Sequence, residues 1–248
     1  MTNMIINDIS SGRRLKQSLS ASIRKRQSEG FFPVISEIKV RSDKEGDLLG
    51  DRDPVVLAQE MARQSIAGIS VVTEQEHFGG SMNLLKAVAA AVNLPVLHKD
   101  FITTERQIEE SAACGAQALL LISSMLELGQ MTLLIERAKR CGLETLVEAH
   151  SQSEIEKIQN LPFDLMGINN RNITIFEVDD NDVSKTEELA GYCKGSRILI
   201  SESSIRSADD VRRAGKGGAG AVLIGTAVLQ AENLIVFLDE LTSVGWPV

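Results

Sequence analysis

The sequence predicts an α/β fold: a single (β/α)8 barrel domain over residues 1–248, with an extra N-terminal helical segment at residues 7–29. Short apolar runs alternate with helical patterns eight times along the chain, as expected of repeated βα units. Most of these runs are apolar throughout, which indicates strands buried on both faces of a parallel sheet. A length of 248 residues is also typical of a one-domain α/β barrel.

The predicted strands are the eight runs at residues 33–39, 67–74, 94–100, 116–124, 143–149, 163–170, 196–203 and 219–226. They recur without a fixed period, so a solenoid of short repeats is not expected. An open, doubly wound sheet is the alternative fold. Its glycine-rich fingerprint would follow the first strand, and the sequence there is not of that kind.

Eight helical patterns follow the runs, at residues 53–65, 81–92, 104–115, 126–142, 151–160, 182–193, 207–215 and 232–244. Their ends carry residues that favour helix termini. Asp53, followed by a proline, and two serines are good N-caps, whereas three glycines suit C-terminal stops. These serines and glycines are Ser151, Ser207, Gly115, Gly142 and Gly215.

The segment at residues 7–29 has the pattern of an amphipathic helix, because Ile9, Leu15, Leu19 and Ile23 can share one face. Its basic residues leave two interpretations open. They form either a surface for an anionic partner or, as we favour, the solvated side of a helix that closes the barrel floor. These residues are Arg13, Arg14, Lys16, Arg24, Lys25 and Arg26.

Composition excludes several classes of protein. Apolar residues make up 43% and charged residues 24% of the chain, which argues against a disordered or fibrous protein. The net charge of −8 argues against nucleic-acid and anionic-membrane partners, although a local basic pocket remains compatible with it. There is neither a run of the roughly 18–20 apolar residues of a membrane helix nor a signal-peptide pattern. Three widely spaced cysteines suit buried free thiols, and we expect a cytoplasmic protein.

Polar side chains follow all eight predicted strands. Catalytic residues of such barrels lie at the carboxyl ends of the strands, so these side chains are the candidates for a pocket. Burying them together is costly unless they pair or meet a charged ligand. The candidates are Glu37, Lys39, Glu74, Lys99, Asp100, Ser123, Ser124, Glu148, His150, Asn169, Asn170, Arg171, Ser201, Glu202, Ser203, Ser204, Gly225 and Thr226.

The charged members of this set indicate acid–base chemistry. Lys39 and Lys99 are cations on separate strands, and an ammonium among apolar residues is expected to have a lowered pKa and to act as an acid or hold an anion. Glu37, Glu148 and Glu202 are carboxyl groups whose pKa values neighbours can push apart into acid and base roles.

The last two strands indicate a phosphate group. Ser203, Ser204, Gly225 and Thr226 offer hydroxyl and backbone N–H groups where barrels commonly hold phosphate. Together with the lysines and glutamates, they predict a small-molecule substrate of the sugar-phosphate type and chemistry without a cofactor.

Three alternatives remain open. Glu148 and His150 are potential metal ligands, but no third ligand is identifiable and we expect no metal. Lys99 could form an imine, as in barrel aldolases, or the barrel could be a non-catalytic, phosphate-binding partner protein. We expect His77 and His98 to be loop or packing residues.

Seven motifs resemble the indole-3-glycerol-phosphate synthase family in order and spacing over residues 33–240. The most specific combination is HFGGS, KDFI and GINNR, and the N-terminal segment also resembles the family. The motifs are VISEIK, ISVVTEQEHFGGS, LPVLHKDFI, LVEAH, MGINNRN, ISESSIR and VLIGTAVL.

The resemblance implies closure of the ring of 1-(2-carboxyphenylamino)-1-deoxyribulose 5-phosphate, with loss of CO₂ and water, in tryptophan biosynthesis. By motif position, Lys99 is implied as the general acid of the condensation. Lys39 would contact substrate anions and donate a proton during dehydration. Glu148 would be the acid or base of that step, and Glu37 would orient and share the work.

The resemblance also implies the substrate contacts. Two phenylalanines would flank the aryl ring, and a serine would lie in a mobile loop that closes over the substrate. The implied residues are Asn169 and Arg171 as a substrate-holding pair, Glu202 and Ser203 in the pocket, Ser203, Ser204, Gly225 and Thr226 around the phosphate, Phe78 and Phe101 at the ring, and Ser42 in the loop.

Three residues depart from the family pattern. Asp43 replaces a proline in the loop after the first strand, Ser204 replaces a glycine, and Asn172 replaces a commonly acidic residue. We expect altered affinity or loop closure, and a positive φ at Ser204 would be costly. Nothing in the sequence settles the oligomeric state, and a monomer is favoured.

Overall fold

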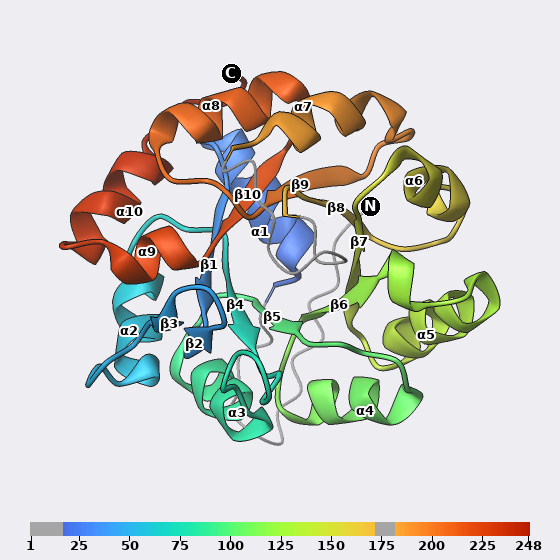
Figure 1. The fold of residues 1–248 in the computed structure, drawn as a ribbon, viewed down its shortest axis with the longest axis horizontal. Coiled ribbons are helices and arrows are strands. Elements are labelled where there is room, and N and C mark those ends of the chain that lie inside the picture. Colours follow the sequence, from blue (N-terminus) through green and yellow to red (C-terminus); the bar gives the residue numbers. More distant parts are fainter. Residues whose placement is uncertain (1–16, 172–181) are drawn as a thin grey trace, which may run out of the picture.

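Eight parallel strands close into a barrel in the computed structural model, which describes residues 17–171 and 182–248 (Figure 1). The barrel closes because β1 pairs with both β4 and β10. Its strands are β1 (Val34–Ile38), β4 (Gly68–Val72), β5 (Val96–Lys99), β6 (Ala118–Ile122), β7 (Glu144–Ala149), β8 (Leu165–Asn169), β9 (Ile198–Glu202) and β10 (Ala221–Ile224). The predicted (β/α)8 architecture is confirmed.

Helices surround the barrel on the outside (Figure 1). Apolar residues fill the interior of the barrel and the layer between strands and helices, which is why most strands are buried along their whole length. The outer helices are α2 (Pro54–Ala62), α3 (Met82–Ala91), α4 (Glu105–Ala113), α5 (Leu128–Arg140), α6 (Gln152–Ile158), α7 (Ser184–Leu189), α8 (Ala208–Gly217), α9 (Thr226–Gln230) and α10 (Leu234–Thr242).

The N-terminal helix α1 (Leu19–Ser28) closes the amino-terminal end of the barrel. Leu19 and Ile23 are fully buried in the interior cluster, and the hydroxyl of Ser22 donates to the carbonyl of Ala67, just before β4. Arg24 and Lys25 are exposed, as predicted for a solvated face, whereas the side chain of Arg26 is only 14% exposed and pairs with Glu29. Residues 7–16 of the predicted segment, with three of its basic residues, lie outside the described part of the chain.

Helix caps agree with the sequence at five positions. Asp53 accepts hydrogen bonds from two N–H groups at the start of α2, and Ser151 and Ser207 cap α6 and α8. Gly115 and Gly142 have φ values of +86° and +74° just after α4 and α5, a conformation that favours glycine.

The expected stop at Gly215 is wrong, because α8 continues to Gly217 and ends at Gly218, which has φ +115°. Gly215 serves close packing instead. A Cβ there would lie 2.2 Å from Cγ2 of Val248 and 2.5 Å from Cε2 of Phe32.

Three short elements, a pair of strands and a helix, were not predicted. Strands β2 (Arg41–Ser42) and β3 (Gly46–Asp47) form a hairpin in the loop after β1, and the five-residue helix α9 follows β10. Such short elements carry little periodicity, and contacts with neighbouring loops hold them. Thr226, the first residue of α9, and Glu45 of the hairpin both line the larger cavity at the mouth of the barrel.

The cysteines are free, as predicted, but each is only half-buried rather than fully buried. Burial raises the pKa of the thiols of Cys114 and Cys193, so they are weak nucleophiles. Among the described helices, none combines the length and apolar character needed to cross a membrane.

Candidate active site

Two adjoining cavities open at the carboxyl ends of the strands. Their volumes are about 410 Å³ and about 280 Å³. The residues that line both cavities are Glu37, Lys39, Lys99, Arg171 and Ser203. The sequence-derived candidates from β1, β5, β8 and β9 therefore meet at one place, as the barrel topology requires.

Lys99 lies among carboxyl groups. Its Nζ is 3.4 Å from Oε2 of Glu37 and 3.3 Å from Oε2 of Glu202. On the other side of Glu37, Nζ of Lys39 lies 3.8 Å from Oε1 and donates a hydrogen bond of 3.2 Å to Oγ1 of Thr226. The arrangement is an alternating row of buried cations and carboxyl groups.

The expected lowering of the lysine pKa is wrong for Lys99. Burial acts to lower its pKa, but Glu37, Glu202 and Glu148 outweigh that effect and raise the pKa. The side chain therefore stays an ammonium at neutral pH, where it can donate protons and bind anions but does not supply the free amine that an imine requires.

The three carboxyl groups separate in pKa, as their sequence pattern suggested. Burial raises the pKa of Glu202 to about 8, and the neighbouring Glu148 adds to that rise while Lys99 opposes it. Burial also acts to raise the pKa of Glu37 and of Glu148. Lys99 and Lys39 overcome it at Glu37, and His150 and Lys99 overcome it at Glu148, so both pKa values are lowered.

Two glycines provide the space for these carboxyl groups. A Cβ at Gly167 would lie 2.3 Å from Oε1 of Glu202, and one at Gly225 would lie 2.6 Å from Oε1 of Glu37. A side chain at either position would displace a carboxyl group from the row. Gly225 therefore contributes to the site because it has no side chain.

The smaller cavity is lined by apolar and aromatic residues. Phe78 and Phe101 both border it, as do Val72, Leu120 and Ile122. Nζ of Lys39 lies 5.7 Å from the centre of the Phe78 ring, a cation–π distance. Glu148 and Asn169 line the same cavity, and Asn169 orients the neighbouring loop by accepting a hydrogen bond from the N–H of Arg171.

The larger cavity contains the predicted phosphate residues Ser203, Ser204, Gly225 and Thr226. Ser203 and Ser204 have φ values of +66° and +59°, so two consecutive side-chain-bearing residues adopt the left-handed conformation. That conformation is costly for L-residues and is often retained at functional sites.

Asn170 holds this strained turn, a role that the sequence did not reveal. Its Nδ2 donates to the hydroxyl of Ser201 and to the carbonyls of Glu202 and Ser203, and its Oδ1 accepts from the N–H and hydroxyl of Thr186. The only signal was its place at the end of a predicted strand.

Ser42 lies apart from the cavity linings. It is buried in the β2–β3 hairpin, where its Oγ accepts a hydrogen bond from the N–H of Glu45. Asp43, which lines the smaller cavity, has its Oδ2 2.9 Å from Nδ1 of His77. This contact joins the hairpin to the loop after β4. The third family departure, Asn172, lies outside the described residues.

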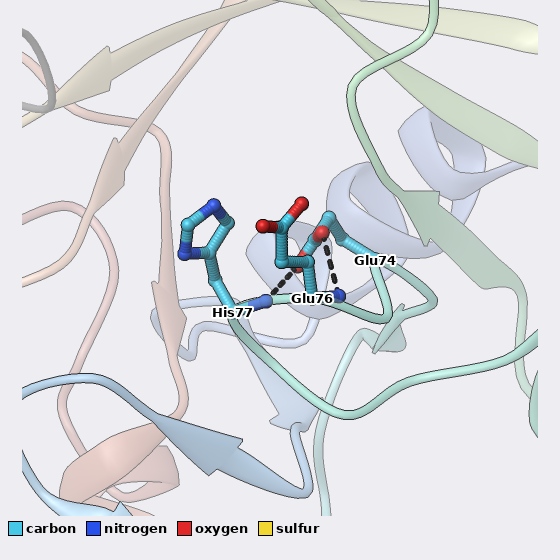
Figure 2. A group of neighbouring side chains, drawn as sticks. All are labelled: Glu74, Glu76 and His77. Carbon is cyan, nitrogen blue, oxygen red and sulfur yellow. Dashed lines mark hydrogen bonds between the residues drawn. The ribbon is translucent and has the colours of Figure 1, made fainter.

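Figure 2 shows Glu74, Glu76 and His77, whose possible metal-ligand atoms lie within 4.8 Å of one another. The carboxylate of Glu74 already accepts hydrogen bonds from the N–H groups of Glu76, His77 and Phe78. It therefore organises the loop that carries Phe78. His98 is a packing residue, as predicted: it is buried, with its ring nitrogens 2.7 Å from Oγ1 of Thr73 and 2.6 Å from Oγ of Ser111.

The closed barrel, with its row of lysines and carboxyl groups at the carboxyl ends of the strands, defines the class of the protein as a (β/α)8-barrel enzyme. A family model described as indole-3-glycerol phosphate synthase matches residues 5–241. The chain belongs to this family, which confirms the resemblance seen in its motifs.

Relatives named indole-3-glycerol phosphate synthase extend over most of the chain. The one from Pyrococcus furiosus is 43% identical and aligns with 87% of this chain and 92% of its own. The one from Thermococcus kodakarensis is 38% identical, with 91% and 97% covered. A solved structure from Aquifex aeolicus VF5, 12% identical, has a TM-score of 0.65 with 90% and 96% covered, and it supports the fold alone.

The left-handed turn predicts an unusual order of stability between two variants. Ser204→Gly should be more stable than Ser204→Ala by about 1 kcal/mol, because both lack the hydroxyl and only glycine tolerates φ +59° without strain. Urea unfolding measures the difference. At the exposed Ser153 in α6, alanine should instead be the more stable. The same order at both positions would contradict the strain.

The free energy of unfolding of Glu202→Gln, relative to that of the wild type, should increase as pH rises. The pKa of Glu202 is raised from 4.5 to about 8, so between these values the folded chain holds a proton that the unfolded chain has lost. The free energy of unfolding of the wild type therefore falls through this window. Glutamine does not titrate. Urea unfolding from about pH 5 to about pH 9 tests this, and a constant difference between the two proteins would contradict it.

Proposed function

We propose that this chain is a carboxy-lyase that closes the ring of 1-(2-carboxyphenylamino)-1-deoxyribulose 5-phosphate, releasing CO₂ and water and forming indole-3-glycerol phosphate in tryptophan biosynthesis. The observation that carries the proposal is the position of the Lys99 ammonium, between Glu37 and Glu202 where an aromatic-lined cavity meets a serine-rich one. Family membership supplies the reaction, and the site supplies groups suited to it.

The two cavities match the two ends of this substrate. Phe78 and Phe101 flank the space for the aryl ring. Ser203, Ser204 and Thr226 border the space for the phosphate. Lys39 and Arg171 line both cavities. They give the site local positive charge, although the whole chain has a net charge of −8. Their positive charge favours binding of the carboxylate and phosphate groups of the substrate.

The condensation needs a proton donor at the ketose carbonyl. In our proposal the aromatic carbon attacks this carbonyl, the new C–C bond forms, and the carbonyl oxygen takes a proton from Nζ of Lys99. The raised pKa of Lys99 does not prevent this transfer, because the alkoxide that develops is a stronger base than an amine. Loss of CO₂ returns the electron pair of its C–C bond to the aryl ring.

The dehydration needs a second acid and a base. Lys39, held between Glu37 and Thr226, donates a proton to the departing hydroxyl, which leaves as water. Glu148 is buried and ionised, because His150 and Lys99 lower its pKa, and it accepts the proton whose removal completes the aromatic ring. Glu37 orients both lysines. Glu202, with its pKa raised to about 8, is a neutral neighbour at pH 7.

The imine alternative has less support, since the raised pKa of Lys99 keeps its amine protonated. We further propose that the protein is cytoplasmic and acts as a monomer on its small-molecule substrate, without a nucleic-acid or membrane partner. Sedimentation of the purified chain measures its mass in solution.

The decisive experiment mixes the purified chain with the carboxyphenylamino-deoxyribulose phosphate. Indole fluorescence should appear together with an equal amount of CO₂. Borohydride added during turnover should leave no adduct on Lys99. Failure to form the indole, from a folded protein at saturating substrate, would exclude the proposed reaction.

Replacing the proposed acid tests its role. Lys99→Ala should lower kcat about 10²–10⁴-fold, the usual contribution of a positioned general acid, while the circular dichroism spectrum stays that of a folded barrel. The matched control is Lys86→Ala, at an exposed position in α3, which should leave kcat unchanged. Turnover by Lys99→Ala at the wild-type rate would remove Lys99 from the mechanism.

A further inference from the structure

A buried imidazole lies directly behind Glu148. His150 follows β7, and its side chain is only 5% exposed. Its Nε2 is 3.3 Å from Oε1 of Glu148, and its Nδ1 is 3.6 Å from Oε2 of Glu154 on α6. The ring therefore separates two carboxyl groups, of which one lines the aromatic cavity and the other lies toward the outside of the barrel.

The outer carboxyl group is itself held in place. Oε2 of Glu154 accepts a hydrogen bond of 2.6 Å from the hydroxyl of Ser123 and one of 3.0 Å from the N–H of His150. Ser151 begins the helix that carries Glu154 by accepting a hydrogen bond from its N–H. The position of Glu154 is thus set by α6 and by the turn after β6, and it fixes one side of the imidazole.

The electrostatics of the row favour an imidazolium between two carboxylates. Burial acts to lower the pKa of His150, but Glu148 and Glu154 outweigh it and raise the pKa to about 9. Burial also opposes ionisation of Glu154, yet His150 and Ser123 lower its pKa to about 2. The other ionisable groups that act on Glu148 are Lys99 from β5 and Glu202 from β9.

His150 differs from an ordinary packing histidine. Both ring nitrogens of His98 lie within hydrogen-bonding distance of hydroxyl groups. In contrast, neither ring nitrogen of His150 has a hydrogen-bond partner among the described residues, and the same is true of Oε2 of Glu148. His150 is therefore held by charge on both sides.

We propose that His150 is a positioning residue for the reaction, which as an imidazolium beside Oε1 keeps Glu148 ionised so that Glu148 can accept the substrate proton. This inference rests on the proposed function of Glu148 as the base. A glutamic acid as buried as Glu148 would otherwise hold its own proton before the substrate arrives. Glu154 fixes the His150 ring and offsets its positive charge, and Ser123 holds Glu154 in place by a hydrogen bond.

The protonation state of His150 can be measured without substrate. The chain contains three histidines, so histidine-to-glutamine variants assign each imidazole signal in a ¹⁵N NMR titration. His150 should remain doubly protonated at neutral pH and lose a proton near pH 9. Glu148→Gln should lower this midpoint by about 1–3 pH units, with His98 as the internal control. A neutral ring at pH 7, or a midpoint unaffected by Glu148→Gln, would overturn the proposal.

The pH dependence of kcat/KM tests the link to catalysis. In His150→Gln the acidic limb should move upward by about 1–3 pH units, because Glu148 loses the cation that favours its ionised form. At a pH below the new limb, kcat/KM should be lower than that of the wild type by about tenfold for each pH unit that the limb has moved. His98→Gln is the matched control, because its ring is buried and lies 3.8 Å from Asp100 rather than beside Glu148, and it should leave the limb in place. An unmoved limb in His150→Gln would assign the residue a structural role only.

Glu154→Gln is the second variant, in case His150→Gln does not fold. This variant removes the carboxylate beside Nδ1 of His150 and should move the acidic limb in the same direction by a smaller amount. An unmoved limb would again count against the proposal. If the wild-type chain does not turn over the substrate, the proposed function fails and the base role fails with it. The NMR titration still decides separately whether an imidazolium is held at Glu148.

Discussion

The site depends on one buried ammonium surrounded by carboxyl groups from across the barrel. Lys99 from β5 interacts with Glu37 from β1, Glu148 from β7 and Glu202 from β9. Such charges are costly to bury alone, so the cluster exists only because barrel closure brings four distant strands together. Its net negative charge keeps the lysine protonated, and the lysine in turn lowers the pKa of two of its three carboxyl neighbours.

The surrounding backbone is shaped to hold this cluster. Gly167 and Gly225 leave room for the carboxyl groups of Glu202 and Glu37. After β9, Asn170 ties down a turn whose two serines adopt left-handed conformations. Strain at this turn is offset by buried hydrogen bonds, and the two serines line the larger cavity together with Lys39 and Thr226. A small number of residues therefore couples the packing of the backbone to the arrangement of the charged groups.

The alternation of cations and carboxyl groups continues beyond Glu148, through His150 to Glu154. Both His150 and Lys99 lower the pKa of Glu148, so two cations together keep this buried carboxyl group ionised. Glu202, which has a single cation beside it and Glu148 as a like-charged neighbour, has a pKa of about 8 instead. Different numbers of cationic partners thus give similar side chains different protonation states at one pH.

The sequence by itself determined the barrel, its helix caps and the candidate residues, because apolar periodicity and strand-end position are local properties of the chain. It predicted Glu37, Lys99 and Glu148 as one site, but their protonation states depend on distances between strands far apart in sequence. Tertiary structure alone therefore decided that the Lys99 pKa rises, that Ser42 lies outside the cavity linings, and that His150 contacts two carboxyl groups. The same holds for Gly215, whose role follows from the side chains of Phe32 and Val248 that pack against it.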